Sequence, residues 1–141
     1  MSVVVDASLV VALVVADERQ AAVRALLEGW VDSGEDLHAP MVLAYEVANV
    51  LARLAFDGEL ETAAVGATWA DLAALDIALH PFDLAQDGPT IAAITARLRR
   101  RHATDSTYIL LAQQLTTVVF TLDGSLARNS AEVGLPVELV T

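Results

Sequence analysis

Short apolar runs rich in β-branched residues alternate along this chain with longer segments rich in Ala and Leu. The clearest runs are residues 2–5 and 117–122, and each is followed directly by an aspartate, Asp6 or Asp123. A strand without polar alternation is buried on both faces, which is typical of a parallel sheet covered by helices. The pattern therefore predicts an α/β fold with a central parallel sheet flanked by helices, an α/β/α sandwich.

The remaining elements follow from apolar periodicity and from residues that begin and end helices. We expect a helix over residues 40–56, with Pro40 as its first residue and Gly58 ending it. A later helix over residues 90–101 is expected to begin directly after Pro89. The other expected helices span residues 7–16, 18–31, 59–75, 104–115 and 126–133; strands are expected over 77–81 and 137–140, and a strand or connector over 36–39.

The chain of 141 residues contains no repeat and no linker long enough to divide it, so we expect one domain over residues 1–141. Its apolar N-terminus has no basic segment before it, and Asp6 interrupts the run. The uninterrupted stretch over residues 9–16 is too short to span a bilayer. We therefore expect a soluble, cytoplasmic protein.

Composition excludes several classes of protein. The chain carries 19 acidic and 8 basic side chains, a net charge of −11, and has neither Cys nor Lys. A disulfide framework and a Cys-based zinc site are excluded, and nucleic-acid binding by basic patches alone is disfavoured. Phosphoryl transfer onto an aspartate, as in haloacid-dehalogenase-like phosphatases or response receivers, normally needs a Lys, so the absence of Lys argues against these classes. The glycine-rich nucleotide-binding motifs are also missing.

Four acids occupy positions where a parallel sheet forms its sites. Asp6 and Asp123 follow strands whose carboxyl ends meet at one edge of the sheet. Glu46 lies at the border of an apolar helical stripe, and Asp105 lies in the first turn of a helix on its inward-facing side. Each acid taken alone also has a structural interpretation, as a helix cap, a first-turn acid, a turn residue or a solvated side chain.

Clustered carboxylates repel one another unless a cation compensates them. Hard oxygen ligands suit Mg²⁺, and Mn²⁺ can substitute for it. Ions of this kind activate water and stabilise charge on phosphoryl oxygens. They would also allow an acidic protein to hold a phosphodiester without a broad basic patch.

The acids lie in four segments whose order spans most of the chain: VVVDASLVVALV, APMVLAYEVANVLAR, HATDSTYILLAQQL and VFTLDGSLAR. Together these segments resemble the PIN-domain nucleases, and within that family the VapC-type toxins of bacterial toxin–antitoxin pairs. The resemblance implies an Mg²⁺- or Mn²⁺-dependent endoribonuclease that forms a homodimer, or a larger toxin–antitoxin assembly, and is neutralised by a cognate antitoxin. It also implies the parallel-sheet fold inferred above.

The resemblance carries over residue by residue. The acids that it implies to bind metal and activate water are Asp6, Glu46, Asp105 and Asp123. The residues that it implies to support them are Ser8, Asn49 and Thr121. Asp105 is followed by Ser106 where the family often has Ala, a small change that leaves the metal role intact.

Half of the positive charge lies in one short run: Arg97, Arg99, Arg100 and Arg101. This run could contact the RNA backbone or an acidic antitoxin segment, or it could be a solvated helix face. The three histidines lack metal-ligand spacing, and Trp30 and Trp69 are expected in the core or a dimer contact. The alternative to an enzyme is a catalytically weak or inactive PIN-like interaction module, although all four acids are present.

Overall fold

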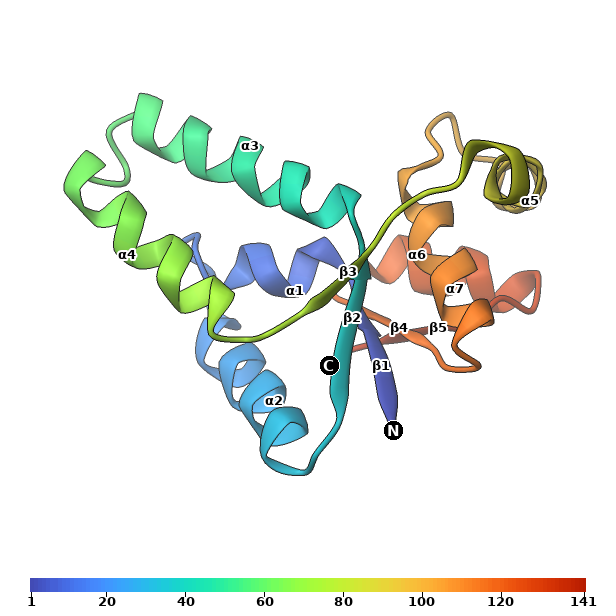
Figure 1. The fold of residues 1–141 in the computed structure, drawn as a ribbon, viewed down its shortest axis with the longest axis horizontal. Helices are drawn as coiled ribbons and strands as arrows, with labels where there is room; N and C mark the ends of the chain where they lie inside the picture. The colour runs from blue at the N-terminus through green and yellow to red at the C-terminus, as the bar shows by residue number, and fades with distance from the viewer.

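A computed structural model describes all 141 residues. Its centre is a five-stranded sheet in the order β3-β2-β1-β4-β5, and every neighbouring pair is parallel (Figure 1). The strands are β1 (Ser2–Val5), β2 (Asp36–Pro40), β3 (Ala78–His80), β4 (Val119–Thr121) and β5 (Val137–Leu139). The predicted parallel α/β fold is confirmed, and the segment over residues 36–39 belongs to a strand.

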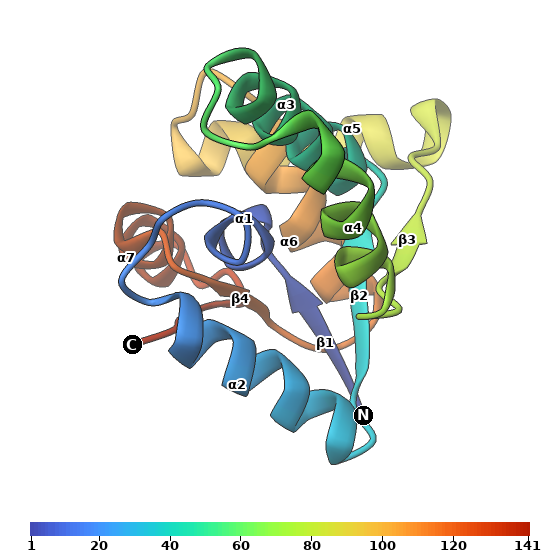
Figure 2. The ribbon, with the colours of Figure 1, turned by 90° about the vertical axis from the view of Figure 1, so that its left-hand side faces the viewer.

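Helices cover both faces of the sheet. Helices α1 (Ala7–Ala12), α2 (Gln20–Asp32), α3 (Val42–Phe56) and α4 (Thr62–Ala73) lie on one side in Figure 1. Helices α5 (Leu84–Leu98), α6 (Thr104–Gln114) and α7 (Gly124–Glu132) lie on the other. Figure 2 shows α3 and α4 as a helical hairpin beside α1.

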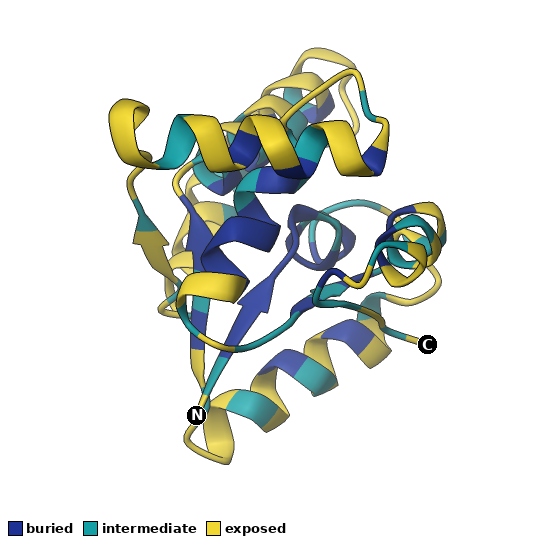
Figure 3. Ribbon diagram, turned by 90° about the vertical axis from the view of Figure 1, so that its right-hand side faces the viewer, coloured by how far each residue is buried: buried dark blue, intermediate teal, exposed yellow.

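The core lies on the two faces of the central strands. Val4 and Val5 of β1 have no exposed surface, and α6 lies against β1 and β2. In Figure 3 the strand that starts at the N-terminus is coloured as buried over most of its length. Twenty-seven buried apolar residues form one continuous cluster. Helix α4 contributes none of them, because it packs against the outside of α3.

We expected Pro40 to begin a helix, but it is the last residue of β2. Strand β1 pairs with β2 only as far as His38, so no residue of β1 lies opposite Pro40. Its missing N–H therefore costs the sheet no hydrogen bond, and the Met41 amide continues the pairing by donating to the carbonyl of His80 at 2.8 Å. Helix α3 begins at Val42.

Helix α5 begins at Leu84, so Pro89 lies inside the helix and not before it. The Asp83 carboxylate accepts a hydrogen bond from the Gln86 amide at 2.8 Å, and the Asp87 carboxylate accepts one from the Asp83 amide at 2.9 Å. This reciprocal capping begins the helix upstream of the proline.

Other helix boundaries also differ from the prediction: α4 is shorter than expected at both ends, and α5 ends at Leu98 and not at residue 101. Helix α1 ends at Ala12 and not near residue 16, because the Gln20 side chain satisfies the Leu13 and Val15 carbonyls from the next helix. Helix α7 begins at Gly124, because Asp123 caps it. No helix is both long and apolar enough to cross a bilayer.

Candidate functional site

Asp6 lies directly after β1 and is held in one orientation. Its Oδ2 atom accepts hydrogen bonds from Ser8 Oγ at 2.7 Å, Thr121 Oγ1 at 2.8 Å and the Ser8 amide at 3.3 Å. The residue is only 7% exposed, and no hydrogen bond reaches Oδ1. Asp6 therefore caps α1, which was the structural alternative to a metal ligand, and it still has one carboxylate oxygen without a hydrogen bond.

The same hydroxyl groups join the carboxyl ends of β1 and β4. Ser8 Oγ accepts from the Leu122 amide at 3.0 Å, and Thr121 Oγ1 accepts from the Asp123 amide at 3.0 Å. Asp123 in turn caps α7 through Oδ1, which leaves its Oδ2 without a partner. Ser8 and Thr121 thus touch the predicted acids directly and fix their positions.

Glu46 on α3 is oriented by a residue that the sequence analysis missed. The Tyr108 hydroxyl donates to Glu46 Oε1 at 2.7 Å, and Tyr108 is only 1% exposed. Its position three residues after Asp105 is the signal that places both side chains on one helix face.

Asp105 lies in the first turn of α6, half-buried, and its carboxylate accepts no hydrogen bond. The neighbouring Ser106 is fully buried, and its hydroxyl pairs with Thr95 Oγ1 of α5 at 2.7 Å. This hydrogen bond explains how a polar residue is accommodated where we expected the family to have Ala. It also ties the start of α6 to the end of α5.

The charges of the four acids act on one another. Burial raises the pKa of Glu46, and the charges of Asp6 and Asp105 raise it further, while the Tyr108 hydrogen bond lowers it. Burial also raises the pKa of Asp105, as do the charges of Asp6 and Asp123. The charges of Asp6 and Asp105 therefore reach Glu46, and those of Asp6 and Asp123 reach Asp105, where Arg100 compensates them in part.

The chemistry of these donors fits a hard divalent cation. Each of the four acids retains at least one carboxylate oxygen without a hydrogen-bond partner. No group of three or more acidic or histidine side chains is already arranged as a finished metal cage. Metal binding by Asp6, Glu46, Asp105 and Asp123 therefore stays a prediction, supported by the free oxygens and the raised pKa values.

The family is settled by comparison with known proteins. The model of the PIN domain family matches residues 3–132, which is nearly the whole chain. The chain belongs to the PIN domain family. PIN domains are typically metal-dependent nucleases, and they generally use divalent metals. No curated protein is similar enough to match.

One solved structure supports the fold of this chain. The chain is similar to PAE2754 from Pyrobaculum aerophilum, with a TM-score of 0.67 and 20% identity over 92% of this chain and 79% of that one. It also matches the PilT N-terminus domain protein SSO1118 from Sulfolobus solfataricus P2, with a TM-score of 0.42 and 9% identity over 99% of this chain and 87% of that one. The first of these likenesses supports the fold and nothing finer.

The arginine run of this PIN domain does not act as one basic face. Arg97 donates a hydrogen bond to the carbonyl of Val133 at the end of α7, and Arg99 and Arg101 are exposed. Arg100 is half-buried, and its charge lowers the pKa of Asp105. Of the four arginines, only Arg100 therefore affects the pKa of one of the acids, Asp105.

Neither the predicted supporting residue Asn49 nor the three histidines nor Trp30 forms a hydrogen bond with any of the four acids. Asn49 is exposed on α3, and its side chain makes no hydrogen bond within the chain. His38 and His80 form a pair on neighbouring strands, with Nδ1 and Nε2 2.8 Å apart, while His102 is exposed. Trp30 packs against Phe120 with ring centroids 4.8 Å apart.

Proposed function

We propose that this PIN domain is an endoribonuclease that hydrolyses RNA phosphodiesters with Mg²⁺ or Mn²⁺ held by Asp6, Glu46, Asp105 and Asp123. The observation that supports this most strongly is that burial and the charges of neighbouring acids raise the pKa of Glu46 and of Asp105, although the four acids come from separate elements. A divalent cation compensates such a cluster, and RNA is a substrate that an acidic protein can bind through it.

The chain's own residues supply the orientation. Ser8 and Thr121 hold Asp6 with Oδ1 free, and Tyr108 holds Glu46 with Oε2 free. When bound to carboxylates of this kind, divalent ions lower the pKa of water and neutralise phosphoryl charge. Water forms the new phosphorus–oxygen bond, the bond to the leaving oxygen breaks, the proton of the water passes to a carboxylate, and the leaving oxygen takes a proton from solvent.

Cleavage of a labelled single-stranded RNA by the purified chain tests this proposal. We expect cleavage in Mg²⁺, none in EDTA, and a loss of at least about 100-fold in Asp6→Asn and Asp105→Asn with folding retained. Glu28→Gln, an exposed acid on α2, is the matched control and should cleave like the wild type. Full Mg²⁺-dependent activity in both aspartate variants, or no cleavage by the wild type, would contradict the proposal.

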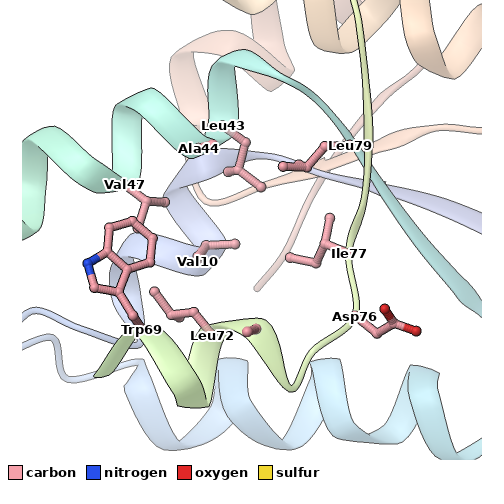
Figure 4. Close-up of a pocket in the computed structure, with 10 residues that line it drawn as sticks. Val10, Leu43, Ala44, Val47, Trp69, Leu72, Asp76, Ile77 and Leu79 are labelled. Atoms are coloured by element: carbon pink, nitrogen blue, oxygen red, sulfur yellow. The ribbon is translucent and has the colours of Figure 1, made fainter. Parts of the chain in front are cut away.

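We further propose that the protein acts as the toxin of a toxin–antitoxin pair and binds a protein antitoxin. A groove of about 250 Å³ between α1, α3 and α4 supports a protein partner (Figure 4). Its lining is apolar except for one carboxylate: Val10, Leu43, Ala44, Val47, Trp69, Leu72, Ala73, Asp76, Ile77 and Leu79. An apolar groove of this kind fits the side chains of an amphipathic segment.

We also propose a homodimer, because large apolar side chains are exposed elsewhere. Phe56 is 91% exposed, Leu84 80% and Tyr45 67%. Light scattering on the purified chain should give twice the monomer mass of 14.9 kDa.

Growth of a bacterial host tests the toxin proposal. Expression of the wild type should stop growth, and expression of Asp6→Asn should not. Binding of a partner without any cleavage would instead favour the alternative, a PIN-like interaction module.

A further inference from the structure

Two histidines on neighbouring strands share a hydrogen bond. His38 Nδ1 and His80 Nε2 are 2.8 Å apart, and the ring centroids are 5.1 Å apart. His38 lies on β2, His80 is the last residue of β3, and both are half-buried. A hydrogen bond between two imidazoles needs one nitrogen that donates and one that accepts. It forms when neither ring or one ring is charged, and it is lost when both are.

Strand β3 has few other attachments to the chain. It is an edge strand of three residues that pairs only with β2. Ala78 and Leu79 are exposed, and no residue of β3 belongs to the buried core. The hydrogen bond between His38 and His80 is the one side-chain hydrogen bond that β3 makes. An element with so little buried apolar surface opens locally at a low cost in free energy, so the loss of this bond matters to β3.

The opposite face of β3 forms one wall of the apolar groove. Ile77 and Leu79 line the groove together with Trp69 and Leu72 of α4, and Figure 4 shows the two pairs on opposite sides of it. Successive side chains of a strand point to opposite faces, and His80 lines a small cavity on the α5 and α6 side. A movement of β3 away from β2 would therefore change the shape of the groove.

The fold opposes a charge on His38. Burial lowers the pKa of His38, and so does the charge of His80, whereas the charge of Asp36 raises it. A histidine whose pKa is lowered by folding, from an ordinary value of about 6.5, stabilises the folded state above that value. This contribution is lost as the pH falls through the pKa of the folded state. The hydrogen bond between the strands is therefore intact at neutral pH and weakened by acid.

The other charged groups around the two rings are acids: Asp36 on β2, Asp76 before β3, Glu35 after α2 and Asp87 on α5. No Arg lines either cavity that the rings border. Strand β1 carries no charged residue, and the acids of α3 and α6 next to the sheet, Glu46 and Asp105, belong to the candidate metal site. The two imidazoles thus supply the positive charge that acid adds at β3.

We propose that His38 and His80 form a pH-sensitive switch that holds β3, and with it one wall of the apolar groove, against the sheet. At neutral pH the shared hydrogen bond ties the two strands together. A second proton removes that bond and places two positive charges on adjacent strands, so β3 separates from β2 and the groove widens. Docking in the groove is thereby made sensitive to pH. The inference depends neither on RNA cleavage nor on which partner occupies the groove.

Hydrogen exchange at pH 7.5 and 5.5, corrected for the pH dependence of intrinsic exchange, tests the switch locally. The protection of residues 77–80 should fall about tenfold at the lower pH, which corresponds to one pKa unit of coupling, while β1 keeps its protection. In His80→Gln, an amide that can donate or accept replaces the ring, so protection should not change with pH. His102→Gln, which removes an exposed histidine, should behave like the wild type.

Tryptophan fluorescence tests the effect on the groove. Quenching of Trp69 by acrylamide should increase between pH 7.5 and 5.5 in the wild type and in His102→Gln, and it should stay constant in His80→Gln. The change should be lost in Trp69→Phe, which leaves Trp30 as the only tryptophan. A change that persists in Trp69→Phe would place the transition outside the groove and contradict its widening.

The remaining outcomes decide the assignment to the histidines. Equal protection of residues 77–80 at both pH values in the wild type would overturn the inference. The same loss of protection in His80→Gln would also overturn it, because Glu46 and Asp105, whose pKa values are raised, would then account for the transition. If circular dichroism shows that His80→Gln is unfolded at pH 7.5, His38→Gln takes its place with the same expectation. Neither measurement involves RNA, so a failure here leaves the proposed nuclease function standing.

Discussion

At the scale of the residue, the four acids are arranged for a ligand and at a cost to stability. Burial and the charge of Asp6 raise the pKa of Asp105, and no hydrogen bond compensates its carboxylate. In EDTA, Asp105→Asn should therefore raise the melting temperature. The effect should be on the order of 1 kcal/mol, or a few degrees, allowing for solvent screening at this half-buried side chain.

The difference in stability between the wild type and Asp105→Asn should also depend on pH. A carboxyl whose pKa is raised by folding destabilises the protein at neutral pH, and the penalty disappears as the pH falls through the folded pKa. The stability advantage of Asp105→Asn over the wild type should therefore shrink between pH 7.5 and 4. An advantage that grew on acidification would contradict the assigned charge repulsion. His38, whose pKa is lowered by burial and by His80, is common to both proteins and cancels.

The hydrogen bond between Tyr108 and Glu46 can be tested separately. Its hydroxyl donates to Glu46 and lowers the pKa of that carboxyl. Tyr108→Phe should cost about 1–2 kcal/mol in urea unfolding and should shift the pH midpoint of Mn²⁺ binding upward, since protons compete better for Glu46. Tyr45→Phe, which alters an exposed tyrosine on α3, is the control. An unchanged pH midpoint in Tyr108→Phe would show that Tyr108 does not position Glu46.

Sequence positions that depend on strand ends could be assigned a role, and those that depend on packing could not. Asp6 and Asp123 could be found because the ends of parallel strands meet at one edge, whatever the packing details. Tyr108 and Arg100 depend on how α6 and the loop before it lie against α3 and the sheet, which no local spacing determines. From sequence, Tyr108 has no assigned role, and Arg100 is named only as one of four neighbouring arginines.

At the scale of the element, capping determines where helices begin. Asp83 caps α5 through the Gln86 amide, whereas Glu61 occupies the same position of α4 without a side-chain hydrogen bond. Asp83→Ala should lower the free energy of unfolding by about 1 kcal/mol, and Glu61→Ala should leave it nearly unchanged. Equal losses in urea titrations of the two variants would show that the cap does not set the start of α5.

The same elements show why the existence of a helix is easier to predict from sequence than the residues at which it begins and ends. The alternation of apolar strands and helices predicted the sheet, because burial on both faces leaves few other folds. Pro40 and Pro89 misled the boundaries for different reasons. Pro40 ends β2 where its missing N–H has no partner on β1, which depends on the register of β1 against β2. Pro89 lies inside α5, because the cap formed by Asp83 and Asp87 begins the helix upstream of it.

At the scale of the whole molecule, a net charge of −11 and an apolar fraction of 55% fit a domain that works through partners. Two bound divalent ions would reduce the charge to −11 + 4 = −7, so contact with RNA should concentrate at the metals. The apolar groove on the α1–α3–α4 side and the acidic sheet edge are distinct surfaces of one domain.

The central claim is that these four acids hold a divalent cation. Anomalous X-ray diffraction from crystals grown with Mn²⁺ tests it most directly. We predict a peak within coordination distance of Asp6 and Asp105, and its absence in crystals of Asp105→Asn that retain the fold. A wild-type crystal saturated with Mn²⁺ that shows no peak at these carboxylates, or a peak only at His38 and His80, would contradict the account.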